Sequence, residues 1–250
     1  GSAEKNGVWL IDPILHTYAN LVDTFKANGY VEGVDLFTFP YQWRDSNVAT
    51  AVLLKNKIDL VKGICNCGKV DLVAHSMGGL VARQYIQSDD YKQDVDQLIF
   101  LGTPHLGSTE SYLTWEAGEK GDSGENNFIE FIFGREAKKL GYASLFDYVV
   151  NKPIASVQEL LPIYDYLKDK ESGQMRQYPN NYPRNLFLEN LNNNVGSLYN
   201  SGVRLTNIVG DLGSGSTLTI ILATGALIFP LWKNGVPDGY DGATSVLGLE

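Results

Sequence analysis

The sequence predicts an α/β fold in which a mostly parallel sheet carries helices on both faces. Strand-like and helix-like apolar patterns alternate over the first hundred residues, and each ends at turn-forming residues. The composition, 44% hydrophobic and 20% charged over 250 residues, is typical of one soluble globular domain with an insertion. Alternation of this kind predicts right-handed crossovers between parallel strands.

The elements before residue 108 are expected where the apolar period changes between two and about 3.6 residues. Proline, glycine and aspartate mark their ends, and Ser or Asp marks a helix start. In chain order the elements are an apolar run at 8–11, a helix over 18–28, a strand over 34–39, a helix from a cap at Asp45 or Ser46 to Gly63, a strand over 70–73, a helix from 77 and a strand over 98–101.

Strand patterns stop near residue 108 and return at 205–209. Between them lie a polar, glycine-rich stretch at 118–127 and helical apolar pieces at 128–133, 145–150 and 155–167. An insertion of this length predicts a largely helical cap whose apolar faces either line a pocket or pack within the cap. We therefore predict a core of residues 1–107 and 202–250 and a cap or lid of residues 108–201.

Charge and cysteine content exclude several classes of partner. The net charge of −9, without a basic cluster, argues against nucleic acid. Cys65 and Cys67 are separated by one residue, and we expect them to be unpaired thiols without a metal, cofactor or catalytic role. The apolar run Leu218–Trp232 contains Gly225 and Pro230 and is too short to span a bilayer. We expect a soluble protein. The sequence does not identify its compartment, which could be secreted or extracytoplasmic.

The segment Ala74-His75-Ser76-Met77-Gly78 joins a predicted strand directly to a predicted helix. Small residues two before and two after Ser76 permit the sharp turn of a nucleophile elbow, which holds the hydroxyl clear of its neighbours. The helix that follows directs free N–H groups at an oxyanion formed there, that of Met77 first. The alternative is an ordinary turn serine, but the strand and helix around Ser76 favour a nucleophile.

A serine nucleophile needs a base, and the base needs an acid to orient it, in the chain order Ser, acid, His. Asp211 follows the predicted strand over 205–209, and Asp241 lies in a predicted tight turn, Gly239 to Thr244. Either could instead be a turn aspartate that bonds its own backbone. His16 precedes the nucleophile, while His75 and His105 are expected near the site but precede both acids. We therefore expect the catalytic histidine to lie outside these 250 residues.

Several segments together resemble the lecithin:cholesterol acyltransferase-like, or lipase, branch of the α/β-hydrolases. They are Trp9 to Pro13, Tyr41-Gln42-Trp43-Arg44, Ala74 to Arg83, Gly102-Thr103-Pro104-His105-Leu106-Gly107-Ser108, Trp115 and Ser156 to Pro162. Gln42 stands where the family usually has Asp. In the family a Pro-Gly loop supplies the first oxyanion donor, and if the matching segment begins at Trp9, this loop would precede Gly1. In a second alignment, which we favour less, Val8–Ile11 is the oxyanion strand and Asp12-Pro13 replaces the usual His-Gly. Asp241 matches the family's Gly-Asp-Gly-Thr-Val turn, which makes it our first choice for the acid and Asp211 the second.

The resemblance implies a serine esterase, lipase or acyltransferase that forms an acyl-enzyme on Ser76 with a lipid or other carboxylic ester. It also implies transient contact with a membrane or lipid interface. The alternative function is a catalytically incomplete hydrolase-fold protein that binds lipid or a protein partner. The missing histidine and Gln42 favour that alternative. The acyl length, the head group, the choice between hydrolysis and transfer, and the oligomeric state stay open.

Overall fold

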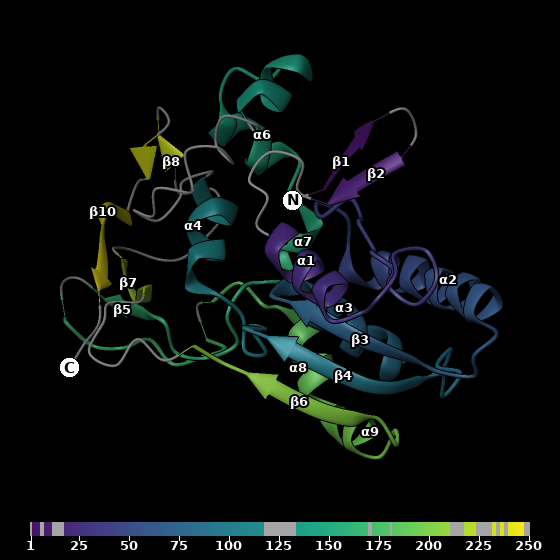
Figure 1. Cartoon of the computed structure of the whole chain (residues 1–250). Coiled ribbons are helices and arrows are strands. Elements are labelled where there is room, and N and C mark those ends of the chain that lie inside the picture. Colours follow the sequence, from purple (N-terminus) through teal and green to yellow (C-terminus); the bar gives the residue numbers. More distant parts are fainter. Residues whose placement is uncertain are drawn as a thin grey trace. The chain divides into compact units, whose positions relative to one another are not determined.

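The structure is a computed structural model of the whole chain (Figure 1). It describes residues 18–117, 134–169, 172–180 and 182–210 in full, and the backbone alone of strands at 2–5, 8–11, 218–223, 232–233, 236–237 and 240–247. These residues form two compact units, which are described separately. Unit 1 comprises Gly1–Thr103 and Asn193–Val209, and unit 2 comprises Pro104–Asn192 and Gly210–Glu250.

Unit 1 contains a parallel sheet of three strands in the order β3-β4-β6. Figure 1 shows the three strands side by side, and the register pairs Ala74 with Phe100 and Phe100 with Asn207. The parallel sheet with helices between its strands confirms the predicted α/β fold. Its elements are β1 (Ser2–Lys5), β2 (Val8–Ile11), α1 (Ala19–Ala27), α2 (Asn47–Cys65), β3 (Val70–His75), α3 (Met77–Ile86), β4 (Val95–Leu101), α9 (Val195–Tyr199) and β6 (Arg204–Ile208).

The core of unit 1 lies between the sheet and the helices α2, α3 and α9. The apolar face of β3 contributes alternate residues, Val70, Leu72 and Ala74, as the period of two predicts. The buried members are Ala51, Leu54, Ile58, Val81, Ala82, Tyr85, Ile86, Val95, Leu98, Phe100, Leu198 and Val203. This packing supports the elbow from below, because α3 supplies four of these side chains.

The predicted strand over 34–39 is wrong. The chain instead turns at 31–36, where the Val31 carbonyl accepts the N–H groups of Val34, Asp35 and Leu36. The Asp35 carboxylate accepts the Val31 N–H at 2.6 Å, and Gly33 takes a positive φ of 82°. Gly33 at positive φ and the bond from the Val31 N–H to Asp35 stabilise this turn, which outweighs the alternating pattern that predicted a strand.

Helix α2 begins as expected and ends two residues later than expected. The Ser46 hydroxyl caps it by accepting the Val48 N–H. The helix passes Gly63 and stops at Cys65, because Asn66 adopts the left-handed conformation that ends helices. This turn brings Cα atoms of Cys65 and Cys67 to 5.2 Å, within disulfide range, and the two sulfurs are bonded. The prediction of unpaired thiols is therefore wrong.

Unit 2 differs from the predicted cap in containing a strand. Residues 155–167 were expected to be helical, but Pro162 follows a short helix and the chain then extends into β5. The elements are α4 (Thr109–Ala117), α6 (Leu145–Asn151), α7 (Ala155–Gln158), β5 (Leu167–Asp169), α8 (Leu186–Asn193), β7 (Leu218–Ala223), β8 (Trp232–Lys233), β9 (Val236–Pro237) and β10 (Tyr240–Leu247). Strand β7 pairs parallel with β5 and antiparallel with β10. The division at residues 107 and 202 remains a prediction.

The core of unit 2 is rich in tyrosine. Its buried members are Tyr112, Leu113, Leu161, Tyr166, Leu167 and Tyr182. The Tyr182 hydroxyl accepts the N–H groups of Tyr166 and Leu167 and donates to the Arg176 carbonyl. Glu116 on α4 is 3% exposed, and burial raises its pKa to about 7, against the neighbouring Tyr112 hydroxyl and Arg176 charge.

The predicted pieces at 118–127 and 128–133 lie outside the described residues. The apolar run Leu218–Trp232 includes strand β7 and the first residue of β8. In the parts of the chain that the structure describes, no helix is both long and apolar enough to cross a membrane.

Candidate active site

Ser76 sits at the sharp turn between β3 and α3. Its backbone has φ 51° and ψ −128°, a region that few residues other than glycine adopt. The Ser76 N–H donates to the Leu101 carbonyl of the neighbouring strand at 2.9 Å, which holds the turn against the sheet. The side chain is half-buried, so the hydroxyl is held at the carboxyl end of β3. In parallel sheets this end is where ligands bind.

The two glycines after Met77 meet different surroundings. A Cβ atom built on Gly78 would have one near neighbour, the Tyr41 hydroxyl at 3.8 Å. A Cβ atom on Gly79 would lie 2.0 Å from Oγ1 of Thr103, 2.7 Å from its Cγ2 and 2.9 Å from Cδ1 of Phe100. Gly79 therefore permits the close approach of α3 to the end of β4, which the elbow requires.

Helix α3 positions the predicted oxyanion donor. Met77 is its first residue, so the Met77 N–H belongs to the first turn, where backbone N–H groups have no intrahelical acceptor. The other end of the helix is buried. Arg83 is 1% exposed, its Nε donates to Gln87 at 3.0 Å, and burial lowers the pKa of Arg83 to about 10. A helix held at its far end fixes the direction of its N-terminus.

The His75 side chain contacts Tyr18, the residue directly before α1. Its Nδ1 atom lies 2.8 Å from the Tyr18 hydroxyl, and the two rings meet edge to face with centroids 5.5 Å apart. Burial lowers the pKa of His75 below its usual value, so the neutral imidazole is favoured. Burial also raises the pKa of Tyr41, whose hydroxyl approaches Gly78. Tyr18 precedes α1 and Tyr41 follows it, so residues on both sides of α1 lie close to the elbow.

His105 belongs to unit 2, whose first residue is Pro104. Its carbonyl accepts a hydrogen bond from Asn192 at 2.9 Å. Gly107 has φ 93°, and a Cβ there would lie 2.6 Å from the Leu161 carbonyl, so the loop after β4 packs tightly against residues 160–163. The Ser108 N–H donates to Leu160 at 2.8 Å in the same contact.

The two candidate acids are described unequally. Asp211 lies outside the described residues, as does His16. The backbone of Asp241 lies in β10 (Tyr240–Leu247), so the predicted tight turn is wrong for residues 240–244, although the pairing of β10 with β7 is irregular between Tyr240 and Ser245. Gly239, the first residue of the predicted turn, lies outside the described residues. Thr244, Ser245 and Val246 favour extended backbone, and this strand tendency outweighs the glycines. The Asp241 side chain lies outside the described residues.

Gln42 stands where the family usually has Asp, and its side chain still accepts a hydrogen bond. Its amide oxygen accepts from Nη1 of Arg44 at 3.0 Å, and the Arg44 guanidinium lies 5.0 Å from the centre of the Trp43 ring. A neutral amide thus fulfils one hydrogen-bonding role of an aspartate at this position. Among the side chains that the structure describes, no cluster of three His, Cys, Asp or Glu could hold a metal ion.

A family model described as lecithin:cholesterol acyltransferase matches residues 9–207, which include the elbow, strands β3 and β4, and β6 except its last residue. The chain belongs to the lecithin:cholesterol acyltransferase family. This membership confirms the resemblance of the sequence to that branch of the α/β-hydrolases.

Two curated relatives come from Arabidopsis thaliana. Phospholipase A(1) LCAT3 is 26% identical over 98 residues, which cover 38% of this chain and 22% of that protein. Lecithin-cholesterol acyltransferase-like 4 is 31% identical over 90 residues, which cover 34% of this chain and 17% of that protein. The chain therefore matches about a fifth of the length of these curated relatives.

Two solved structures are similar to this chain, each at 20% sequence identity. The crystal structure of the Tle4–Tli4 complex has a TM-score of 0.43 and 20% identity, over 83% of this chain and 48% of that chain. The Bacillus licheniformis lipase BlEst2 in its mature form has a TM-score of 0.31 and 20% identity, over 76% of this chain and 74% of that chain.

Sequence reasoning missed the contacts that support the elbow. Tyr18 carried no signal, because its bond to His75 joins residues 57 positions apart. Thr103 and Tyr41 stood in segments that resembled the family, but nothing in those segments indicated contact with Gly79 and Gly78. Glu116 had no signal either, since its burial follows from the packing of α4.

Proposed function

We propose that this chain carries the nucleophile of an enzyme that cleaves or transfers the acyl group of lipid carboxylic esters. The observation that carries the proposal is the backbone of Ser76, held with positive φ between β3 and α3. Holding a serine in this conformation costs about 1–3 kcal/mol, and backbone strain of this kind is concentrated at functional sites. Family membership and the names of the relatives, a phospholipase A(1) and an acyltransferase-like protein, support the same chemistry.

In the proposed reaction, Oγ of Ser76 attacks the ester carbonyl and forms an acyl-enzyme, and the alcohol leaves. The Met77 N–H stabilises the negative charge on the carbonyl oxygen in the tetrahedral intermediate. Water then releases the acid, or a second alcohol takes the acyl group. Asp241 is the proposed acid, with Asp211 as the second choice, and a histidine base completes the triad.

Lipid esters are the proposed substrates because of the family and its phospholipase and acyltransferase members. An apolar acyl chain would bind to apolar side chains of the predicted cap, and contact with a lipid interface would deliver it. The exposed Leu106 and Leu140 of unit 2 are candidates for that contact. No nucleic acid, metal or cofactor enters the proposed mechanism.

A fluorophosphonate probe tests the nucleophile directly, because it bonds covalently to activated serines. The natural full-length protein is expected to be labelled, and Ser76→Ala to lose the label. Ser172→Ala is the matched control, since Ser172 is an exposed turn serine of unit 2 and its loss should leave labelling unchanged. Absence of labelling in the full-length protein would contradict the proposal.

A second candidate is a hydrolase-fold protein without turnover that binds lipid or a protein partner. One observation favours it. His75, the histidine next to Ser76 in the chain, has its Nδ1 atom 2.8 Å from the Tyr18 hydroxyl, so this nitrogen is already engaged in another hydrogen bond. This candidate predicts binding to phosphatidylcholine vesicles without release of p-nitrophenol from p-nitrophenyl hexanoate. Hydrolysis by the full-length protein that Ser76→Ala abolishes would refute it.

A further inference from the structure

We propose that the Cys65–Cys67 disulfide is a thiol–disulfide exchange site whose substrates are dithiols. Its reduction loosens the end of α2 and, through Lys62 and Asp94, the helix that follows Ser76. The bond joins the only two cysteines of the chain. The proposal does not depend on the hydrolase activity.

A thiol in solution can reach the Cys65–Cys67 disulfide, which closes a short loop. Both cysteines are half-buried, while Asn66 between them and Gly68 after them are exposed. A disulfide stabilises a protein mainly by restricting the unfolded chain, and a loop with one residue between the cysteines restricts it least. Bridges that a thiol can reach are more readily exchanged than fully buried ones.

The exchange proceeds in two balanced steps. A thiolate of the dithiol attacks one sulfur of the bridge, the S–S bond breaks, and the other cysteine sulfur leaves as a thiolate that takes a proton from water. The second thiol of the reagent then attacks the mixed disulfide, releases the second cysteine thiol and closes the reagent's own disulfide. Two electrons and two protons pass from the dithiol to the protein.

The bridge stabilises the C-terminal cap of α2. The Lys62 carbonyl accepts the N–H groups of Asn66 and Cys67, the latter at 3.3 Å, and the Cys65 sulfur lies 3.9 Å from the same oxygen. In the disulfide that sulfur carries no proton, so it cannot donate. After reduction the Cys65 thiol can compete for the Lys62 carbonyl, and Cys67 is no longer held beside it. The cap therefore weakens when the bridge opens.

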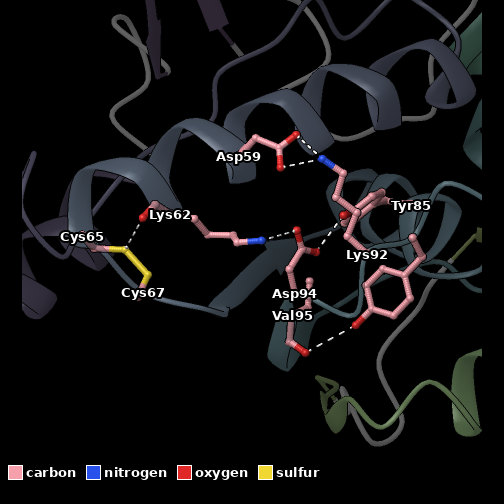
Figure 2. A network of polar contacts seen from close by, with 9 residues as sticks. Asp59, Lys62, Cys65, Cys67, Tyr85, Lys92, Asp94 and Val95 are labelled. Atoms are coloured by element: carbon pink, nitrogen blue, oxygen red, sulfur yellow. Dashed lines mark hydrogen bonds and ion pairs between the residues drawn. A yellow bond between two sulfur atoms is a disulfide. The ribbon is translucent and has the colours of Figure 1, made fainter.

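The weakened cap is connected to α3 by a buried network (Figure 2). Lys62 Nζ contacts Oδ2 of Asp94 at 3.1 Å, and the Tyr85 hydroxyl donates to Oδ1 of Asp94 at 2.7 Å. The Asp94 side chain is 1% exposed, and its carbonyl accepts the N–H of Val70, the first residue of β3. Asp94, the residue before β4, thus connects three elements: its carboxylate contacts the end of α2 and α3, and its backbone carbonyl contacts the start of β3.

The first test counts thiols in the native protein with a maleimide of known mass. Air-oxidised protein is expected to take up none, and protein treated with dithiothreitol without denaturant to take up two. Since the chain holds no other cysteine, the mass alone identifies the site. Two labels before reduction, or none after it, would overturn the proposal.

The second test follows amide hydrogen exchange with and without dithiothreitol. Reduction is expected to raise exchange by about tenfold at residues 62–70, and to a smaller extent at the C-terminal turns of α3. Tyr85→Phe removes only the hydroxyl that joins α3 to Asp94, so the change at 62–70 should persist while the change in α3 disappears. Tyr91→Phe is the matched control, because Tyr91 packs on Tyr85 and its hydroxyl bonds Val95 instead. No redox-dependent exchange at 62–70, or an unchanged α3 response in Tyr85→Phe, would refute the coupling.

Discussion

The contact between Gly79 and the end of β4 yields a sharp test of how the elbow is built. Gly79→Ala adds one methyl group at a position where Thr103 and Phe100 already stand within 3 Å. Gly78→Ala adds the same methyl group one residue earlier, where the nearest atom is the Tyr41 hydroxyl at 3.8 Å. Both glycines lie in α3, so the two variants share their helical background.

The two variants are expected to change the free energy of unfolding in opposite directions. Replacing a helical glycine by alanine stabilises by about 0.5–1 kcal/mol when space is free, which is the prediction for Gly78→Ala. Overpacking a dense core costs about 1–3 kcal/mol, and Gly79→Ala should lie near the upper end of that range. Rotation of Thr103 offers little relief, because both Oγ1 and Cγ2 lie within 2.7 Å of the new atom.

Urea unfolding, followed by circular dichroism and tryptophan fluorescence, measures both variants. We expect a lower midpoint for Gly79→Ala than for the wild type, and an equal or higher midpoint for Gly78→Ala. Thr103→Ala removes the two nearest of the three clashing atoms and should restore most of the stability of Gly79→Ala, with a coupling energy above about 1 kcal/mol. Equal midpoints for the two glycine variants would refute this account of the packing.

Two further predictions concern buried carboxyl groups. Because the pKa of Glu116 is raised from 4.5 to about 7, the folded state binds an extra proton between these values and loses up to about 3 kcal/mol of stability as the pH rises through them. Glu116→Gln should therefore match the wild type near pH 4.5 and exceed it at pH 8, and equal pH profiles in denaturant titrations would count against burial of this carboxyl. Asp94→Ala leaves Lys62 and Tyr85 without their shared acceptor and should cost about 3 kcal/mol in the same titrations. Asp59→Ala, which removes an exposed partner of a lysine, should cause no measurable change, and similar losses in both would refute the distinction.

The features predicted from sequence were those determined by neighbouring residues. The elbow needs small residues on both sides of Ser76 and a strand-to-helix transition, and the cap of α2 needs a serine followed by a helical pattern. Both are properties of five to fifteen consecutive residues. The parallel sheet followed from the alternation of such segments.

The features that sequence reasoning missed depend on distant partners or on a single backbone angle. Strand β5 has three residues, and its parallel partner β7 begins some fifty residues later, so no local pattern revealed it. The disulfide depends on the left-handed conformation of Asn66, which one φ angle decides. The raised pKa of Glu116 depends on the tyrosine-rich core that closes around α4.

The candidate acid illustrates the same limit. Glycines around Asp241 indicated a turn, whereas residues 240–247 form β10, whose pairing with β7 is irregular between Tyr240 and Ser245. Choosing between Asp241 and Asp211 depends on which carboxylate reaches the base, and reach is a property of tertiary structure. Sequence order narrows the choice to residues after Ser76 and goes no further.

The positive φ of Ser76 separates what is good for stability from what is good for chemistry. A glycine at this position would adopt the same backbone without steric cost, so optimisation for folding alone would select glycine. A hydroxyl is the one thing that glycine cannot supply. Stability screens of this chain will therefore favour substitutions at residue 76 that abolish the proposed reaction, and a gain in melting temperature there should be treated as a warning rather than an improvement.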